Sequence, residues 1–271
     1  MANNPLGVCY TLTNSSNPLD LGMYQLQNGN LVFDIGILFA ANINYDTEKQ
    51  EAYLYFNDTV SNILNNVETY VRPLQAKGIK VLLSILGNHQ GAGISNFPNQ
   101  AAATAFAQQL TDAVNTYGLD GIDFDDEWAE YGNNGTGQPN EFSFPYLVSA
   151  LREQLPSKLI TMYFIGPAAD SLSYGTINVG SLINYSWNPY YGTFSAPDIP
   201  GMSNSQLSAA AVGIAAEEGY TPPAEAAQLA QQTIEQGYGV FMYYNLPDSD
   251  QSSYLTQVTK QLYGEMTTYT G

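Results

Sequence analysis

Hydrophobic residues gather along this chain in eight short runs that are rich in Val, Ile, Leu, Phe and Tyr. Short apolar runs of this composition are typical of strands in a parallel sheet that is covered on both faces. The pattern therefore predicts strands near residues 6–11, 31–39, 79–86, 118–125, 159–165, 182–187, 210–216 and 239–245.

Between most of these strands, apolar residues recur at the spacing of an amphipathic helix. Three of the helical segments are followed by Gly78, Gly118 and Gly237, a common helix end, and one is preceded by Pro222 and Pro223. Helices are predicted over residues 53–77, 100–117, 140–155, 224–236 and 249–263.

Two connections lack a helical pattern. Residues 166–181 are rich in Gly, Ser and Asn, and residues 188–209 contain Pro189, Pro197 and Pro200. Eight strands that alternate with helices predict an α/β fold, a TIM (β/α)8 barrel. We expect helices five and six of that barrel to be missing or reduced. No linker or repeat is visible, so a single barrel domain over residues 1–271 is predicted.

Charge narrows the range of partners. The chain has 25 acidic and 7 basic residues, a formal net charge of −18. Such a surface repels phosphate backbones and anionic membranes, so neither nucleic acid nor membrane is expected as a partner. A neutral ligand fits better, and the 21 tyrosines offer flat rings with a hydroxyl group for binding sugars.

Little is implied about the compartment. Cys9 is the only cysteine, which excludes an intrachain disulfide, and it is expected to be a buried, inert thiol. The first seven residues, MANNPLG, lack the charged and apolar regions of a signal peptide. The chain is therefore expected to be either cytoplasmic or the mature form of a secreted protein.

The candidate chemistry lies in the fourth predicted strand, whose sequence LDGIDFDDE carries acids among apolar residues. Side chains alternate along a strand, so Asp123, Asp125 and Glu127 share one face and Asp126 takes the other. Three neighbouring acids cannot all be ionised without cost. At least one pKa should rise, which is how a carboxyl group stays protonated to act as a general acid.

Calcium binding is the main alternative for a run of acids, but counting from Asp120 or Asp123 places neither the glycine nor the final glutamate of an EF-hand loop correctly. A solvated acidic turn would not be interleaved with Ile122 and Phe124. We assign Asp120 a structural role at the start of the strand and Asp126 an outward orientation.

The spacing D-x-x-D-x-D-x-E, from Asp120 to Glu127, resembles the active-site strand of glycoside hydrolase family 18. The segments KVLLSILGNHQGAG (80–93), YGLDGIDFDDEWAEYGNNGT (117–136) and SWNPYYG (186–192) are together similar to the endo-β-N-acetylglucosaminidase H-like enzymes of that family. The likeness extends over most of the chain. It also supports the reduced fifth and sixth helices, for which these enzymes are known.

The resemblance implies a substrate-assisted mechanism with retention at C1. Glu127 is the general acid and base, Asp125 holds the 2-acetamido group of the substrate and stabilises an oxazolinium ion, and Asp123 tunes Asp125. Since the substrate supplies its own nucleophile, a second catalytic carboxylate is not needed.

Further residues are expected to line the substrate site. By the resemblance, Ser84 bonds near Asp123, and one of Tyr163, Asn188 and Tyr191 bonds the acetamido carbonyl. The remaining candidates are Trp187, for which a place in the core is the alternative, Tyr244 as the floor under the sugar unless Tyr243 faces inward instead, Asn88, His89, Gln90, Phe39, Asn42 and Asn44.

The activity expected from the resemblance is cleavage of the N,N'-diacetylchitobiose core of high-mannose or hybrid N-glycans on glycoproteins. A chitinase is the alternative, although Leu86-Gly87-Asn88 departs from the S-x-G-G pattern of chitinases. A non-catalytic sugar-binding barrel is a third reading, which the presence of Glu127 disfavours. His89 is the only histidine, so no zinc site and no cofactor are expected, and we expect a monomer.

Overall fold

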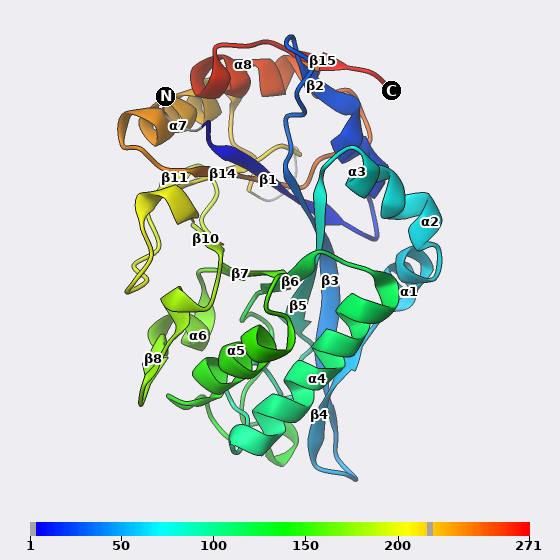
Figure 1. Ribbon diagram of the computed structural model, residues 1–271, viewed down its shortest axis with the longest axis vertical. Helices are drawn as coiled ribbons and strands as arrows, with labels where there is room; N and C mark the ends of the chain where they lie inside the picture. Colours follow the sequence, from blue (N-terminus) through cyan, green and yellow to red (C-terminus); the bar gives the residue numbers. More distant parts are fainter. Residues whose placement is uncertain (1–3, 216–218) are drawn as a thin grey trace.

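A curled sheet of parallel strands forms the centre of the computed structural model, which describes residues 4–215 and 219–271 (Figure 1). Its neighbouring strands follow the order β14-β1-β3-β5-β6-β7-β10-β12, with β13 on the other side of β14. The strands are β1 (Leu6–Leu12), β3 (Ile35–Asp46), β5 (Lys80–Gly87), β6 (Gly121–Phe124), β7 (Leu159–Tyr163), β10 (Tyr185–Trp187), β12 (Leu207–Ser208), β13 (Ala210–Gly213) and β14 (Val240–Tyr244).

The ring closes through the seventh strand, which is divided at Ala209. Its first part, β12, pairs with β10, and its second part, β13, pairs with β14. The eight predicted strands are thus present in barrel order, and the predicted (β/α)8 class is confirmed. Residue 216, the predicted end of the seventh strand, lies outside the described residues.

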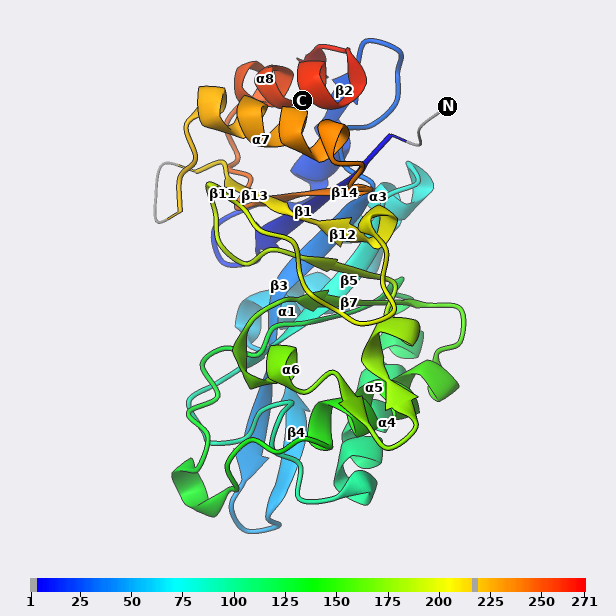
Figure 2. The same cartoon turned by 90° about the vertical axis from the view of Figure 1, so that its left-hand side faces the viewer.

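Helices cover the sheet unevenly. In Figures 1 and 2, α4 (Gln100–Tyr117) and α5 (Ser143–Gln154) lie together beside the middle strands, while α7 (Pro223–Glu235) and α8 (Ser252–Tyr263) form a layer over β14 and β1. These four helices match the sequence prediction. Where helices five and six were expected to be reduced, the chain has the five-residue α6 (Gly166–Asp170), short pairings at β8 (Ser173–Tyr174), β9 (Ile177–Asn178) and β11 (Thr193–Phe194), and 3-10 turns.

The predicted helix over residues 53–77 is wrong at its start and is not continuous. Residues 53–55 belong to β4 (Glu51–Tyr55), which pairs with the extended end of β3 as a hairpin. The backbone hydrogen bonds of this hairpin stabilise residues 53–55 as a strand, although their apolar side chains have helical spacing. The remainder forms α1 (Asp58–Asn65), α2 (Val67–Tyr70) and α3 (Arg72–Ala76), which are separated at Asn66 and at Val71. Pro73 lies in the first turn of α3, where a proline is tolerated.

Two apolar layers hold this arrangement together. The outer layer packs helices against the outward faces of the strands and includes Cys9, whose pKa is raised by burial as expected of an inert thiol. The inner layer fills the barrel with Val8, Tyr10, Ile37, Leu82, Trp187 and Met242 among others. The barrel is therefore a packed core, and its chemistry lies at the strand ends.

β2 (Tyr24–Leu26) and β15 (Thr267–Tyr269) form a separate pair beside α8.

Candidate active site

Three acids extend from the fourth barrel strand beyond its last paired residue, Phe124. The backbone N–H of Asp125 donates to the carbonyl of Ile85 at 3.0 Å, and that of Gly87 donates to the carbonyl of Glu127 at 3.0 Å. The acidic segment thus stays beside β5 as it leaves the barrel. It lies at the carboxyl end of the strands, the end that carries catalysis in this fold.

Asp123 is fully buried among three hydroxyl groups. Tyr10 and Ser84 donate to Oδ2 at 2.8 and 2.9 Å, and Thr161 donates to Oδ1 at 2.7 Å. The contact expected between Ser84 and Asp123 is therefore present. Burial raises the pKa of Asp123 to about 6, although the three hydrogen bonds act in the opposite direction by stabilising the carboxylate.

Asp125 and Glu127 share a hydrogen bond at the mouth of the barrel. The pKa of buried Asp125 is raised well above its usual range, first by desolvation and then by the charges of Glu127, Asp123 and Asp126. Desolvation also raises the pKa of half-buried Glu127. The pair therefore retains a proton that isolated carboxyl groups would lose, as a site for general acid catalysis requires.

One oxygen of this pair is unusual. Among the described residues, Oδ1 of Asp125 has no hydrogen-bond partner although it is buried. Buried polar atoms are nearly always paired, and apart from the carboxyl group of Glu127 the described residues offer this oxygen no donor, so it is open to a donor from a substrate. An amide N–H of a substrate is a donor of the right kind.

Asp126 is not solvated, although it was expected to face outward. Its carboxyl group is buried and accepts hydrogen bonds from Ser95 Oγ at 2.6 Å, from the Tyr131 hydroxyl, and from the N–H of Ala168 at 2.7 Å. These partners lie in the loop after β5, in the loop after β6 and in α6. Asp126 therefore ties the loops around the site to the strand that carries Asp125 and Glu127.

A group of tyrosines lines the inner wall next to the acids. The Tyr163 hydroxyl donates to the carbonyl of Pro189 at 2.7 Å and lies 2.9 Å from the hydroxyl of Tyr191. The ring of Tyr191 stacks on Tyr244 with centroids 4.6 Å apart. Tyr244 belongs to the inner layer, whereas Tyr243 is buried in the outer one, so Tyr244 is the residue that faces the site.

Two other candidates support the site from within the protein. Trp187 is fully buried and donates from Nε1 to the Tyr10 hydroxyl at 2.7 Å. The buried Asn188 amide donates to the Ala209 carbonyl at 2.9 Å and to Thr193, and its Oδ1 accepts from the N–H of Tyr190. The hydrogen bonds of both side chains are made to other groups of the protein, so a contact of either with a sugar stays a prediction.

The polar candidates on the neighbouring loops are hydrogen-bonded within the protein. Asn88 donates to Oδ1 of Asn44 at 2.8 Å, Gln90 Oε1 accepts from the N–H of Tyr45, and Asn42 donates to the Gly87 carbonyl at 3.2 Å. Phe39 meets Tyr10 edge-on at 5.8 Å. The structure thus brings these loops together beside β3 and β5, and their sugar contacts stay predictions.

Sequence reasoning missed several residues of this site. Tyr10 and Thr161 were not singled out as partners of Asp123, nor was Trp128, whose side chain is 60% exposed directly after Glu127. A signal for Thr161 exists in the register, because Ser84, Asp123 and Thr161 lie side by side on adjacent strands. That register can be read only once the strands are aligned.

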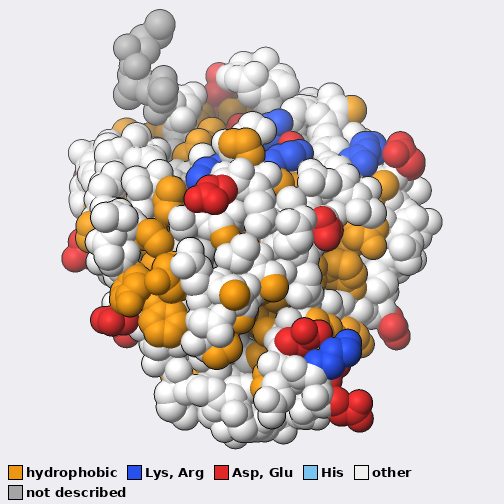
Figure 3. Space-filling model, turned by 60° about the horizontal axis from the view of Figure 1, so that its bottom comes forward, with side chains coloured by type: hydrophobic (Ala, Val, Ile, Leu, Met, Phe, Trp, Pro, Cys, Tyr) orange, Lys and Arg blue, Asp and Glu red, His pale blue; other side chains and the backbone are white. Residues whose placement is uncertain are grey.

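The part of the chain that the structure describes places neither a metal-binding cluster nor a membrane-spanning helix beside the acids. Over residues 4–215 and 219–271, no group of three or more His, Cys, Asp or Glu side chains is arranged to hold a metal ion. Over the same ranges, none of the helices combines the length and the apolar character needed to cross a bilayer. Figure 3 shows a surface that is mostly uncharged, with hydrophobic side chains in groups and a few charged side chains, and the turn of the β3–β4 hairpin holds Lys49 between Asp46 and Glu51.

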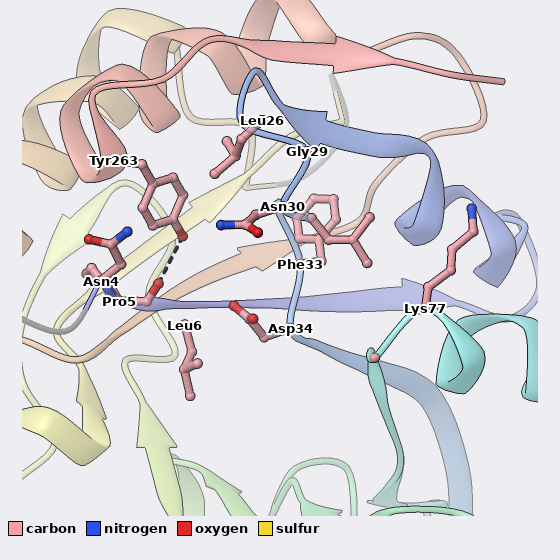
Figure 4. Close-up of a pocket in the computed structure, with 12 residues that line it drawn as sticks. Asn4, Pro5, Leu6, Leu26, Gly29, Asn30, Phe33, Asp34, Lys77 and Tyr263 are labelled. Carbon is pink, nitrogen blue, oxygen red and sulfur yellow. Dashed lines mark hydrogen bonds between the residues drawn. The ribbon is translucent and has the colours of Figure 1, made fainter.

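A pocket of about 340 Å³ opens at the opposite, amino-terminal end of the strands (Figure 4). There Asp34 accepts a hydrogen bond from the N–H of Gly7 at 2.8 Å, and the Tyr263 hydroxyl donates to the carbonyl of Pro5 at 3.0 Å. These bonds fasten the ends of β1 and β3. In barrels of this kind that end serves stability rather than chemistry.

The sequence as a whole matches a known family. Residues 8–186 match the family model described as glycosyl hydrolases family 18. This chain belongs to that family.

Two proteins of similar sequence are both described as endo-beta-N-acetylglucosaminidases. An endo-beta-N-acetylglucosaminidase of Flavobacterium sp. (strain SK1022) is 54% identical over 265 residues, which cover 98% of this chain and 82% of the relative. Endo-beta-N-acetylglucosaminidase F1 of Elizabethkingia meningoseptica is 33% identical over 273 residues, covering 96% and 78%.

Among solved structures, EndoBT-3987 of Bacteroides thetaiotamicron, in a complex with Man5GlcNAc product, superposes with a TM-score of 0.86 at 28% identity. The match covers 98% of this chain and 62% of that one, so this chain spans somewhat less than two thirds of that relative's length. The same protein has been solved in complex with Man9GlcNAc2Asn substrate.

The raised pKa values predict an unusual dependence of stability on pH. Asp123 has a folded pKa of about 6 against an ordinary value of 3.8, and the pKa values of Asp125, Asp126 and Glu127 are raised as well. Between about pH 4 and 6 the native state therefore binds more protons than the unfolded state, and the free energy of unfolding should rise as the pH falls. Asp123 alone should contribute roughly 3 kcal/mol over this window.

Thermal unfolding followed from pH 7 to pH 4.5 checks this expectation: Tm should increase toward pH 4.5. In Asp123→Asn the increase should be smaller, because the substituted amide does not titrate. A Tm that falls steadily over the same range in the unsubstituted chain would contradict the raised pKa values.

Proposed function

We propose that this chain is an endo-β-N-acetylglucosaminidase that cleaves the β-1,4 bond of the N,N'-diacetylchitobiose core of high-mannose and hybrid N-glycans. The observation that carries this proposal is the hydrogen-bonded pair of Asp125 and Glu127, in which the buried Oδ1 of Asp125 is open to a donor from a substrate. An N-acetylglucosamine offers that donor in its acetamido N–H. The relatives' names and the glycans bound to EndoBT-3987 support the choice of substrate.

In the first step Glu127 protonates the oxygen that links the two N-acetylglucosamines. The acetamido carbonyl oxygen of the sugar nearer the mannoses attacks its own C1, the bond from C1 to the protonated oxygen breaks, and the asparagine-linked sugar leaves with a hydroxyl group. The product on the enzyme is an oxazolinium ion. Because the nucleophile is part of the substrate, it needs no separate approach to C1.

Asp125 stabilises this intermediate. Its carboxyl group accepts the acetamido N–H. Because the proton retained by the Asp125–Glu127 pair passes through Glu127 to the leaving oxygen, Asp125 is then ionised, and its negative charge lies beside the positive charge of the oxazolinium ring. Asp123 stays fixed by its three hydroxyl partners, so its charge acts on Asp125 from a constant position. Tyr244 and Tyr191 offer a stacked aromatic surface for the sugar, and one of Tyr163, Asn188 and Tyr191 is the proposed donor to the acetamido carbonyl.

In the second step Glu127, now ionised, removes a proton from water, and the resulting oxygen attacks C1 while the oxazolinium ring opens. Two inversions at C1 give retention. The cycle uses the same side chain as acid and then as base, which fits a carboxyl group whose pKa is raised. We propose that residues 1–271 act as one catalytic domain and as a monomer, with no cofactor.

A chitinase would use the same acids, so the strand-four motif does not separate the two activities. The loop segments near residues 88–90 and 186–192 favour the endoglycosidase. A direct comparison distinguishes them: incubation with ribonuclease B, a glycoprotein with high-mannose glycans, and with chitohexaose, both read by mass spectrometry. We expect release of the glycan with one N-acetylglucosamine left on the protein. Cleavage of chitohexaose alone would support the chitinase.

Glu127→Gln should keep the fold and lose at least about a hundredfold in kcat, the usual contribution of a general acid. Gln has nearly the same shape but has no proton to give to the leaving oxygen. Turnover on the glycoprotein and Tm are the two measurements. Near-normal turnover would remove Glu127 from this role, and a Tm lowered as by a core cavity would assign it a structural one.

Asp125→Ala should separate the two steps. Formation of the oxazolinium ion should be slowed strongly, whereas a preformed sugar oxazoline should still be transferred to an N-acetylglucosamine acceptor, since Glu127 remains to activate that acceptor. Glycan hydrolysis and oxazoline transfer by the same preparation give the measurement. If Asp125 were instead a covalent nucleophile, a fluorosugar would label it, and a glycosyl-Asp125 peptide would contradict the proposed mechanism.

A further inference from the structure

Three side chains that the proposed mechanism does not use meet at the rim of the site. The ring of Trp128 is 60% exposed and lies 5.7 Å from the ring of His89. Nδ1 of His89 lies 2.7 Å from Oε1 of Glu130, and Oε2 of Glu130 accepts a hydrogen bond from Asn133 at 2.9 Å. We call Trp128, His89 and Glu130 the rim platform.

All three residues of the rim platform have left-handed backbone conformations. The φ angles are 58° at Trp128, 56° at His89 and 52° at Glu130, and the described chain has only three other non-glycine residues with positive φ. For a residue as bulky as tryptophan this conformation is an outlier. Strain of this kind clusters at functional sites, and at an exposed position a glycine would adopt the same backbone without it.

Backbone hydrogen bonds hold the rim platform in place. The N–H of His89 donates to the carbonyl of Trp128 at 2.7 Å, and on either side Gly87 bonds to Glu127 and Gly91 bonds to Ala129. The two loops are thus fastened together along their length. The backbone that carries the exposed indole is therefore ordered before a ligand binds, which lowers the entropic cost of binding.

The position of the rim platform relative to Glu127 identifies what it would meet. In the sheet, β6 lies between β5 and β7. Tyr163 extends from β7, on one side of the acids, whereas His89 follows β5 and Trp128 is bonded to it, on the other side. Tyr191 follows β10, and Tyr244 ends β14, which lies opposite β6 in the ring, so the sugar held by Asp125 and the tyrosines lies over the barrel and away from β5. The sugar across the protonated oxygen then lies on the side of β5.

We propose that the rim platform binds the leaving N-acetylglucosamine, the one that stays attached to asparagine, with a face of its ring against the indole of Trp128. The inference rests on the proposed function. Its chemistry is that of a neutral sugar on an aromatic face, with the polar edge of the sugar toward the His89–Glu130 pair. Trp128 would thereby favour a sugar over water as the acceptor in the second step.

The test uses a preformed sugar oxazoline as donor and p-nitrophenyl N-acetylglucosamine as acceptor, and it measures transfer and hydrolysis in the same reaction. In Trp128→Ala, kcat/KM for the acceptor should fall about threefold to tenfold, the range expected for one aromatic contact. Hydrolysis of the oxazoline should stay within about twofold, since water needs no platform. Trp128→Phe should recover most of the transfer.

Tyr220→Ala is the matched control, because Tyr220 is also an exposed aromatic residue but lies near α7 and α8. It should leave both rates unchanged. An unaltered ratio of transfer to hydrolysis in Trp128→Ala would overturn the inference, and so would an equal loss of both rates, which would mean that Trp128 supports the acids. A loss seen only with a glycoprotein acceptor would show that the indole faces polypeptide and would also overturn it.

The proposed function fails differently. If the unsubstituted chain releases no glycan from ribonuclease B and transfers no oxazoline, the endoglycosidase assignment is wrong and the inference is overturned with it. If the unsubstituted chain does both and only the Trp128→Ala ratio is unaltered, the assignment stands and the role of the rim platform alone is wrong.

Discussion

The hydrogen bonds that surround the Asp123 carboxyl group are the constraint on which this site depends. A carboxyl group with no exposed surface is costly inside a barrel unless donors surround it, and here β1, β5 and β7 each provide one hydroxyl. Trp187 adds a second layer by donating to the Tyr10 hydroxyl. Strands that are distant in the sequence must therefore keep one register, because a slip by one residue would turn a donor away.

The three acids that follow Asp123, within residues 123–127, have different surroundings and therefore different roles. Asp125 lies above Asp123 and is nearly buried, Glu127 reaches partial exposure, and Asp126 is anchored on the opposite side by Ser95, Tyr131 and Ala168. Alternation along one strand thus separates a proton-sharing pair from a structural carboxyl group. The loops that Asp126 joins hold the end of the strand still, which preorganises the pair for proton transfer.

Much of this arrangement follows from local sequence. The barrel strands, the four long helices and the reduced connections near residues 166–209 follow from periodicity and from proline and glycine positions, and the facing of Asp123, Asp125 and Glu127 follows from alternation alone. The β3–β4 hairpin does not, because residues 53–55 fit a helical pattern and only the pairing partner decides otherwise. Tyr10, Thr161 and Trp128 were missed for a related reason: their importance arises from register and from backbone conformation, neither of which is local.

Raised pKa values at the mouth of the barrel have a consequence for any effort to improve this protein. At neutral pH each crowded, desolvated carboxyl group weakens the fold that carries it, so exchanging an acid for its amide would relieve repulsion while it abolished chemistry. A library of variants sorted only for heat resistance at pH 7 would accordingly collect inactive proteins with intact barrels. Activity has to be part of the selection, because the substitutions that stabilise this fold at pH 7 are the ones that remove its catalytic carboxyl groups.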